Sequence, residues 1–258
     1  MYISIFDLFK IGIGPSSSHT MGPMLAASMF VKFINKHSNK IESINVDLHG
    51  SLAYTGKGHK TYEAILLGLN GCKPDSINNK KMNELIDNNI KTSKILIGDD
   101  LILFDYKKDI SPRYNNHEYD NKSNPMVFDC VLNDGSSIKK TYYSIGGGFV
   151  VDGDDSKQNI LKKEYKYNFA SMSELIELCD ENTNIYDVVL ENEYCVDTKD
   201  NVRDKILNIW SVMDEIINSG IKATGRIDDI LKVDKRAHLL KNNIKQKDRY
   251  DPLDIMDW

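Results

Sequence analysis

Apolar positions in the first third of the chain recur with a helical period at two places. After Pro23 in the sequence, apolar residues recur at three- to four-residue spacing, which puts them on one side of a helix. Proline suits the first turn, because its missing N–H would have no intrahelical partner there. A second helix is predicted over 61–69, ahead of Gly71. The apolar positions of the first helix are Leu25, Ala26, Met29, Phe30, Phe33 and Ile34, and those of the second are Ala64, Ile65, Leu66 and Leu67.

Alternation with a period of two predicts strands elsewhere in the first 155 residues. Ile44, Val46 and Leu48 are separated by single polar residues, as in a half-buried strand. Two short strands are predicted over 94–97 and 101–104, joined at Gly98-Asp99-Asp100.

A hairpin is predicted over 126–132 and 137–144, because the Asp134-Gly135 pair between them tolerates the positive φ angles of a tight turn. The polar stretch over 111–125 is predicted to be a loop.

After Val151 in the sequence, the pattern of apolar positions predicts helices. A polar connector over 152–156 comes first. Ser171 and Glu174 then have the spacing of a capping box at a helix start. A longer helix is predicted over 202–218, with its end near Gly220.

These elements predict an α+β amino-terminal domain over residues 1–155, with a mixed sheet and packed helices, and an α-helical segment over 156–258. The last residues, from Asp251-Pro252 to Trp258, have the form of a helix start. Two readings of that ending stay open. It is either a tail that docks on its own domain or the point at which a further domain begins.

Composition narrows the classes of function. With a net charge of -5 and no basic cluster, the 258-residue chain lacks the electrostatic footprint of a nucleic-acid-binding protein. No segment approaches the roughly 20 apolar residues that span a bilayer. The amino terminus has an acidic residue, Asp7, where a signal peptide has basic ones. We therefore expect a cytoplasmic protein without nucleic-acid or membrane partners.

Four cysteines are spread along the chain with no C-x-x-C pair among them. Their spacing does not suggest a zinc or redox motif. Distant cysteines can still converge in a fold, so spacing alone leaves a cluster open, and free thiols are the preferred interpretation. The four are Cys72, Cys130, Cys179 and Cys195.

The stretch over 12–23 is the first candidate site. Glycine and hydroxyl residues directly ahead of a helix N-terminus form a candidate anion site, since backbone N–H groups point outward there and the hydroxyls add donors. His19 could add a proton-transfer group. From these residues alone, a capped helix and a ligand site are equally well supported. The hydroxyl residues are Ser16, Ser17, Ser18 and Thr20.

The stretch over 49–61 is the second candidate. It is not a P-loop, because Lys57 is followed by glycine and Gly50 lies one position too far away. What remains is a glycine-rich loop between a strand and a helix, with Lys57, His59 and Lys60. A histidine beside a cation can stay neutral and act as a base near pH 7. A surface histidine on a loop is the equally supported alternative.

A third motif, over 142–149, places three glycines behind a predicted strand. Glycines there permit an unusual turn or a close backbone approach. A structural turn is the preferred interpretation.

Taken together, the three motifs resemble the iron–sulfur-dependent L-serine dehydratase (L-serine ammonia-lyase) family. The resemblance begins at Ile5-Phe6-Asp7 and includes the Gly-Pro-Ser-Ser-Ser-His-Thr segment ending at Thr20. It continues through 55–59 and 142–151 and, more weakly, to Asp257-Trp258.

The resemblance implies a reaction and roles for residues. Family members convert L-serine to pyruvate and ammonia by a β-elimination assisted by a [4Fe–4S] cluster. Carried over, Ser16, Ser17, Ser18 and Thr20 would hold the substrate carboxylate. His19 and His59 would be the proton-transfer groups, without a choice of base between them, and Lys57 an electrostatic neighbour.

The sequence also departs from the family. The helical catalytic domain that carries the cluster ligands in single-chain members does not follow Trp258, and none of the four cysteines lies in a cluster-binding context. We therefore assign no metal ligand. The resemblance implies an oligomeric enzyme part that is inactive alone and completed by a separate cluster-bearing chain. The alternative is a truncated or degenerate fragment, or a non-catalytic amino-acid-binding module.

Overall fold

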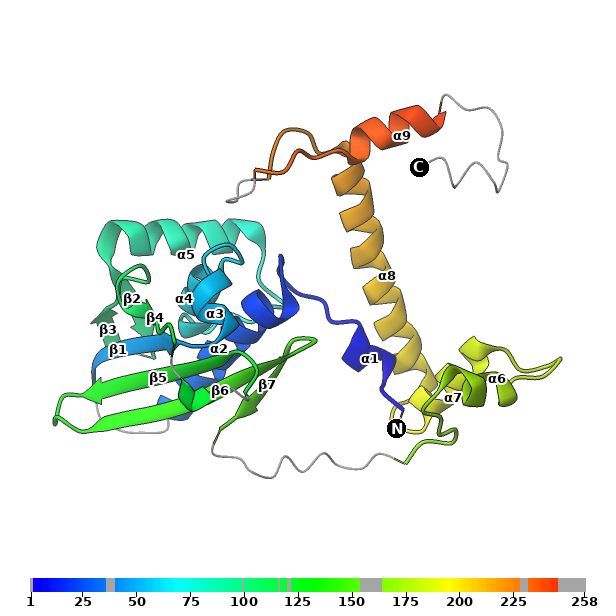
Figure 1. Cartoon of the computed structure of the whole chain (residues 1–258), viewed down its shortest axis with the longest axis horizontal. Helices are drawn as coiled ribbons and strands as arrows, with labels where there is room; N and C mark the ends of the chain where they lie inside the picture. The colour runs from blue at the N-terminus through cyan, green and yellow to red at the C-terminus, as the bar shows by residue number, and fades with distance from the viewer. Residues whose placement is uncertain are drawn as a thin grey trace. The chain divides into compact units, whose positions relative to one another are not determined.

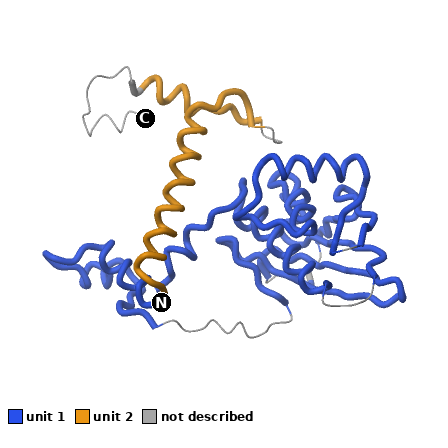
Figure 2. Tube along the Cα trace, turned by 180° about the vertical axis from the view of Figure 1, so that it is seen from behind, with its two compact units in different colours: residues 1–196 blue, residues 197–258 orange. Residues whose placement is uncertain are grey.

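The protein is described here from a computed structural model. The structure describes residues 2–35, 40–98, 100–115, 117–119, 122–153, 164–227 and 232–245. The chain divides into two compact units, residues 1–196 and residues 197–258 (Figure 2).

A five-stranded mixed sheet forms the centre of the first unit (Figure 1). Its strand order is β4-β1-β5-β6-β7, with β4 parallel to β1 and every other pair antiparallel. The strands are β1 (Ile41–Leu48), β4 (Ile110–Pro112), β5 (Pro125–Leu132), β6 (Ser137–Gly146) and β7 (Phe149–Asp152).

Helices α2 (Gly22–Ile34) and α4 (Thr61–Leu69) pack on each other, and α2 also packs on β5, β6 and β7. Their approach is close. A Cβ on Gly68 would lie 2.2 Å from the carbonyl oxygen of Met24, so only glycine fits between the two helices there. The apolar stripe of α2 and the alternating side chains of β1 enter one buried core, which includes Phe30, Ile44 and Phe128.

Most of the predicted elements of this unit are confirmed. Both predicted helices form, and the predicted strand over 44–48 is the end of β1. The short strands are β2 (Lys94–Ile97) and β3 (Asp100–Leu103), which pair with each other. The predicted hairpin is formed by β5 and β6. Gly147 and Gly148 form the turn between β6 and β7 with positive φ angles, as the turn interpretation requires.

Two regions differ from the sequence-based prediction. The predicted loop over 111–125 contains the end of β4, a 3₁₀ turn η2 (His117–Tyr119) and the start of β5. A three-residue strand is too short to show alternation, so only its pairing with β1 reveals it. The helices α3 (Ser51–Thr55) and α5 (Asn79–Thr92) were not predicted. In α5 most positions are polar and exposed, and its apolar residues Met82, Leu85 and Ile86, which do recur at helical spacing, are only partly buried.

The described residues that follow the sheet domain, 164–196, contain helices and no strand. They form α6 (Met172–Glu177) and α7 (Ile185–Tyr194), and the Ser171 hydroxyl accepts from the amide of Glu174 as the capping box predicted. The predicted connector over 152–156 lies outside the described residues from position 154 onward.

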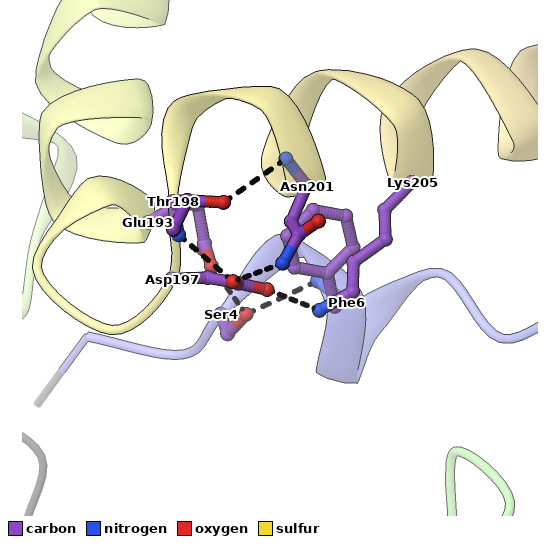
Figure 3. A network of polar contacts seen from close by, with 7 residues as sticks. All are labelled: Ser4, Phe6, Glu193, Asp197, Thr198, Asn201 and Lys205. Atoms are coloured by element: carbon purple, nitrogen blue, oxygen red, sulfur yellow. Dashed lines mark hydrogen bonds and ion pairs between the residues drawn. The ribbon is translucent and has the colours of Figure 1, made fainter.

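The amino-terminal segment, including α1 (Ile5–Leu8), is fastened to α7 through the buried carboxylate of Glu193. Glu193 accepts hydrogen bonds from the Tyr2 hydroxyl (2.6 Å), the Ser4 hydroxyl (2.8 Å) and the Ile5 amide (3.0 Å). Figure 3 shows the contacts of Ser4 with Glu193 and with the Phe6 amide. Three donors on one carboxylate satisfy a group that would be costly to bury alone.

The second unit contains α8 (Lys199–Lys222) and α9 (Ala237–Lys245). The Thr198 hydroxyl caps α8, and Asp197 accepts from Asn201 and Lys205 over its first turns (Figure 3). The helix predicted over 202–218 is confirmed, and it ends at Lys222, two residues beyond Gly220. The predicted helix start at 251–258 lies outside the described residues.

The observed architecture is α+β, with a mixed sheet and packed helices, as predicted. Within the described ranges, no helix combines the length and the apolar character needed to cross a membrane. The domain boundary predicted at residue 155 concerns family domains rather than compact units, and it stays a prediction.

Candidate functional site

The serine-rich segment forms one turn of π-helix, η1 (Ser17–Met21), that runs directly into α2. Ser16 stands in extended conformation ahead of it, and its hydroxyl accepts from the amide of His19 at 3.1 Å. The amides of Thr20 and Met21 donate to the carbonyl oxygen of Ser16. The segment is therefore both a helix cap and an ordered set of polar groups.

Two backbone donors of this turn are left over. In the described part of the chain, the amide N–H groups of Ser17 and Ser18 have no acceptor, and the Ser17 side chain is exposed. Adjacent unpaired N–H groups at the start of a helical turn are suited to bind an anion. A carboxylate is an anion of the right size for such a pair.

Two buried threonines tie this turn to the glycine-rich loop. The Thr20 hydroxyl donates to the carbonyl oxygen of His59 at 2.7 Å, and the Thr61 hydroxyl donates to the carbonyl oxygen of His19 at 2.5 Å. Both threonines are at most 1% exposed. The reciprocal bonds fix the backbone of each histidine against the other motif.

As a result, the rings of His19 and His59 lie with their centroids 4.8 Å apart and their planes tilted by 43°. Burial lowers the pKa of His19 below its ordinary value, and the charge of His59 lowers it further. Both effects disfavour the imidazolium form of His19. A neutral His19 is the expected form near pH 7.

His19 is the first member of a hydrogen-bonded chain. Its Nδ1 lies 2.9 Å from the hydroxyl of Ser18, and its Nε2 lies 2.9 Å from the hydroxyl of Ser51. The Ser51 hydroxyl donates to Oδ1 of Asn124 at 2.6 Å. The Asn124 amide nitrogen donates to the carbonyl oxygen of Ser144 at 2.8 Å. Both ring nitrogens of His19 are thus occupied by protein groups.

His59 is bound differently. Its Nδ1 lies 3.0 Å from the carbonyl oxygen of Thr55, one helical turn earlier. A carbonyl oxygen can only accept, so Nδ1 carries the proton. In neutral His59 the lone pair is then on Nε2, which has no hydrogen-bond partner among the described residues. This nitrogen is free to accept a proton from a bound molecule.

Lys57 stands apart from this arrangement. It is exposed in the turn between α3 and α4, and its ammonium contacts neither histidine in the described hydrogen bonds and ion pairs. The structure thus brings together the serine-rich segment and both histidines, and it does not bring Lys57 into their network.

A cavity of about 470 Å³ lies beside the serine-rich segment. Its lining includes Gly12, Gly14 and Thr20, and also Lys60 and Glu63, which carry opposite charges. Neither histidine lines it. Both histidines are half-buried, so the cavity and the histidine pair are separate features of this region.

The described residues do not fit an iron–sulfur cluster. Such a cluster needs several cysteine thiolates that converge on it. Burial, and next the charge of Asp129, raise the pKa of Cys130 to about 11, and burial also raises the pKa of Cys72. Over the described ranges, no three His, Cys, Asp or Glu side chains are placed to hold a metal ion.

Sequence reasoning did not single out Ser51, Thr61 and Asn124. Ser51 and Thr61 lie inside the second motif, at the first positions of α3 and α4, and neither is the N-cap residue of its helix. Asn124 lies in the polar stretch that was predicted to be a loop, and nothing in its neighbourhood distinguishes it from other loop asparagines. Only the fold brings it to Ser51.

Comparison with known proteins gives a family match and relatives that are similar over nearly the whole of this chain. The model of the family described as serine dehydratase beta chain matches residues 4–155. L-serine dehydratase 1 of Escherichia coli is 32% identical over 262 residues, which cover 99% of this chain. The L-serine dehydratase of Streptomyces coelicolor is 36% identical over 267 residues, which cover all of it. This chain spans 58% of the length of each of these two relatives.

Proposed function

The chain belongs to the serine dehydratase beta chain family, and on that premise we propose that it is the substrate-binding part of an enzyme that converts L-serine to pyruvate and ammonia. The single observation that carries this proposal is the pairing of a free His59 Nε2 with the unpaired amides of Ser17 and Ser18. The first can accept the α-proton of an amino acid, and the second can hold its carboxylate.

In this proposal the serine carboxylate binds to the amides of Ser17 and Ser18 and to the Ser17 hydroxyl. Charge-assisted hydrogen bonds of this kind are short and strong. Ser16 and Thr20 shape the turn through their own hydrogen bonds. All four residues named by the resemblance therefore contribute, two by direct contact and two by holding the backbone, with Ser18 also bound to His19.

His59 then accepts the α-proton of serine on Nε2. The carbonyl oxygen of Thr55 holds the opposite side of the ring and stabilises the imidazolium that forms, since the Nδ1–H it accepts becomes more acidic. His19 stays neutral beside it. Lys57, exposed in the neighbouring turn, acts at most through its charge.

When bound, a [4Fe–4S] cluster would supply a Lewis-acidic iron for the departing β-hydroxyl. The described residues do not provide its ligands, so this chain is assigned binding and proton transfer only. We further propose that residues 1–155 are the substrate domain and that the helical residues 156–258 belong to an all-α catalytic domain. A separate chain would complete that domain, and the assembly would be a cytoplasmic oligomer.

The proposal is tested by reconstitution. The chain is co-expressed under anaerobic conditions with a polypeptide that carries the part of an L-serine dehydratase relative that this chain does not cover. A brown co-purified complex that forms pyruvate from L-serine is expected, whereas the chain alone should form none. A complex that assembles and stays inactive overturns the enzymatic proposal.

The unpaired amides favour one second candidate, a non-catalytic amino-acid-binding module. The two are separated by calorimetric titration of the chain alone with L-serine. Binding of L-serine by the chain, combined with an inactive reconstituted complex, would support the module.

A further inference from the structure

The orientation of the Asn124 side chain is fixed by its backbone partner. Its amide group lies 2.8 Å from the carbonyl oxygen of Ser144, which can only accept a hydrogen bond. The group that faces Ser144 is therefore the NH₂, and Oδ1 faces the hydroxyl of Ser51. Oxygen and nitrogen of an asparagine amide are assigned from the network, and here the network permits one assignment.

The direction of the next bond follows from the count of protons. The Ser51 hydroxyl has one proton, and Oδ1 of Asn124 at 2.6 Å can only accept it. Ser51 must then accept, through its lone pair, from Nε2 of His19 at 2.9 Å. In neutral His19 the proton is therefore on Nε2.

The opposite nitrogen is determined by the same argument. Neutral imidazole carries one proton, so Nδ1 of His19 is an acceptor, and the Ser18 hydroxyl at 2.9 Å donates to it. His59, by contrast, has its proton on Nδ1 because Thr55 offers only a carbonyl oxygen. The two neighbouring rings thus have opposite tautomers.

We propose that Asn124 is a positioning residue which, through Ser51, holds His19 in the Nε2–H tautomer, so that the free basic nitrogen of the pair is that of His59. Asn124 touches neither histidine. Its effect on chemistry rests on the proposed function, but the tautomer itself does not. A serine molecule that enters the pair then meets one basic nitrogen instead of two.

The chain contains a matched control for Asn124. Asn115 also has a positive φ angle, 55° against 48° for Asn124, and its Oδ1 also accepts a hydroxyl bond, from Tyr54 at 2.8 Å. Asn115 does not belong to the chain of bonds that begins at His19. Replacement by glycine suits both positions, because glycine adopts positive φ without strain.

The test is ¹⁵N NMR of the histidine side chains in the full-length chain at pH 8, which is above the ordinary histidine pKa of about 6.5. For the unmodified chain we expect Nε2–H for His19 and Nδ1–H for His59. In Asn124→Gly the Ser51 hydroxyl loses its fixed acceptor, and the tautomer ratio of His19 should fall about fivefold, the effect of one ordinary hydrogen bond. Asn115→Gly and Ser51→Thr, which keeps the hydroxyl, should leave the ratio unchanged.

An Nδ1–H tautomer for His19 in the unmodified chain would overturn the proposal, and so would an equal effect of Asn124→Gly and Asn115→Gly. No substrate or partner chain takes part in this measurement. Its failure is thus distinct from an absence of pyruvate formation in the reconstituted complex.

Discussion

The Thr20 hydroxyl donates a 2.7 Å hydrogen bond to the carbonyl oxygen of His59, 39 positions further along the chain. In the same way, the Thr61 hydroxyl donates a hydrogen bond to the carbonyl oxygen of His19. Thr20 lies near the end of η1 and Thr61 is the first residue of α4, and η1 and α4 contact each other, so the two motifs are fixed through their backbones. The separation of the two imidazole rings is therefore set by buried bonds and does not depend on the rings themselves.

Thr20→Val tests this fixation. Valine has the shape of threonine but leaves the carbonyl oxygen of His59 and the amide of Ser16 without their buried partner. We expect a loss of about 1–3 kcal/mol in the free energy of unfolding, measured by urea titration. Thr55→Val is the control, because the Thr55 hydroxyl is exposed and bonds only within its own helical turn. A change within about 0.5 kcal/mol is expected there, and equal losses in the two variants would contradict the role of Thr20.

The lowered pKa of His19 predicts a pH dependence of stability. The unfolded chain takes up a proton on this residue near the ordinary pKa of about 6.5, while the folded chain does so only at lower pH. As the pH falls below about 6.5, the unfolded state binds more protons and the free energy of unfolding decreases. Burial lowers the pKa of His49 as well, so the whole protein shows the sum of both effects.

The contribution of His19 is isolated with His19→Gln. The quantity compared is the slope of the unfolding free energy against pH between pH 8 and pH 5, and not its absolute value, since the variant also loses hydrogen bonds. The slope should be smaller in the variant. Parallel slopes would mean that His19 has the same pKa in the folded and unfolded chains.

The close approach of α2 and α4 predicts that Gly68→Ala is destabilising. The added methyl group would lie 2.2 Å from the carbonyl oxygen of Met24 and 2.7 Å from Cβ of Ala27, and backbone must move to admit it. A loss of about 1–3 kcal/mol in unfolding free energy is expected from overpacking. Gly220→Ala in α8 is the control, since nothing lies within 4 Å of its added Cβ. There the helix should gain about 0.5–1 kcal/mol.

Much of the fold could be predicted because its buried elements have clear periods. The stripe of α2 and the alternation of β1 reflect burial on one side, which is what a sequence pattern records. The elements that were missed are short or mostly exposed, and α3 with five residues and β4 with three are too short to show a period. In α5 only Asn89 is fully buried, and β4 is recognisable only because its three residues pair with β1.

The residues of the candidate site could be predicted from the sequence, but the protonation of the two histidines could not. The resemblance indicated His19, His59 and the serine-rich segment, and the fold places them together. It did not indicate which nitrogen carries each proton. That depends on hydrogen bonds made by Thr55, Ser51 and Asn124, and only the tertiary structure brings these residues to the two histidines. The assignment of catalytic roles stays a prediction until turnover is measured.

Replacement of His59 tests that assignment most directly. In the reconstituted complex, His59→Gln removes the only free imidazole nitrogen of the pair, and the turnover number for L-serine should fall by about 10²-fold or more. His19→Gln should also reduce turnover by about 10²-fold, because it breaks the hydrogen-bonded chain to Ser51 and Asn124 beside the base.

Chemical rescue distinguishes the two histidines when each is replaced by alanine. Added imidazole should restore part of the activity of His59→Ala, where it can replace the missing base, and none of the activity of His19→Ala. His238→Gln in α9 is the control and should keep its turnover within about twofold. Near-normal pyruvate formation by His59→Gln would remove this residue from the catalytic machinery, and rescue of His19→Ala alone would exchange the roles of the two histidines.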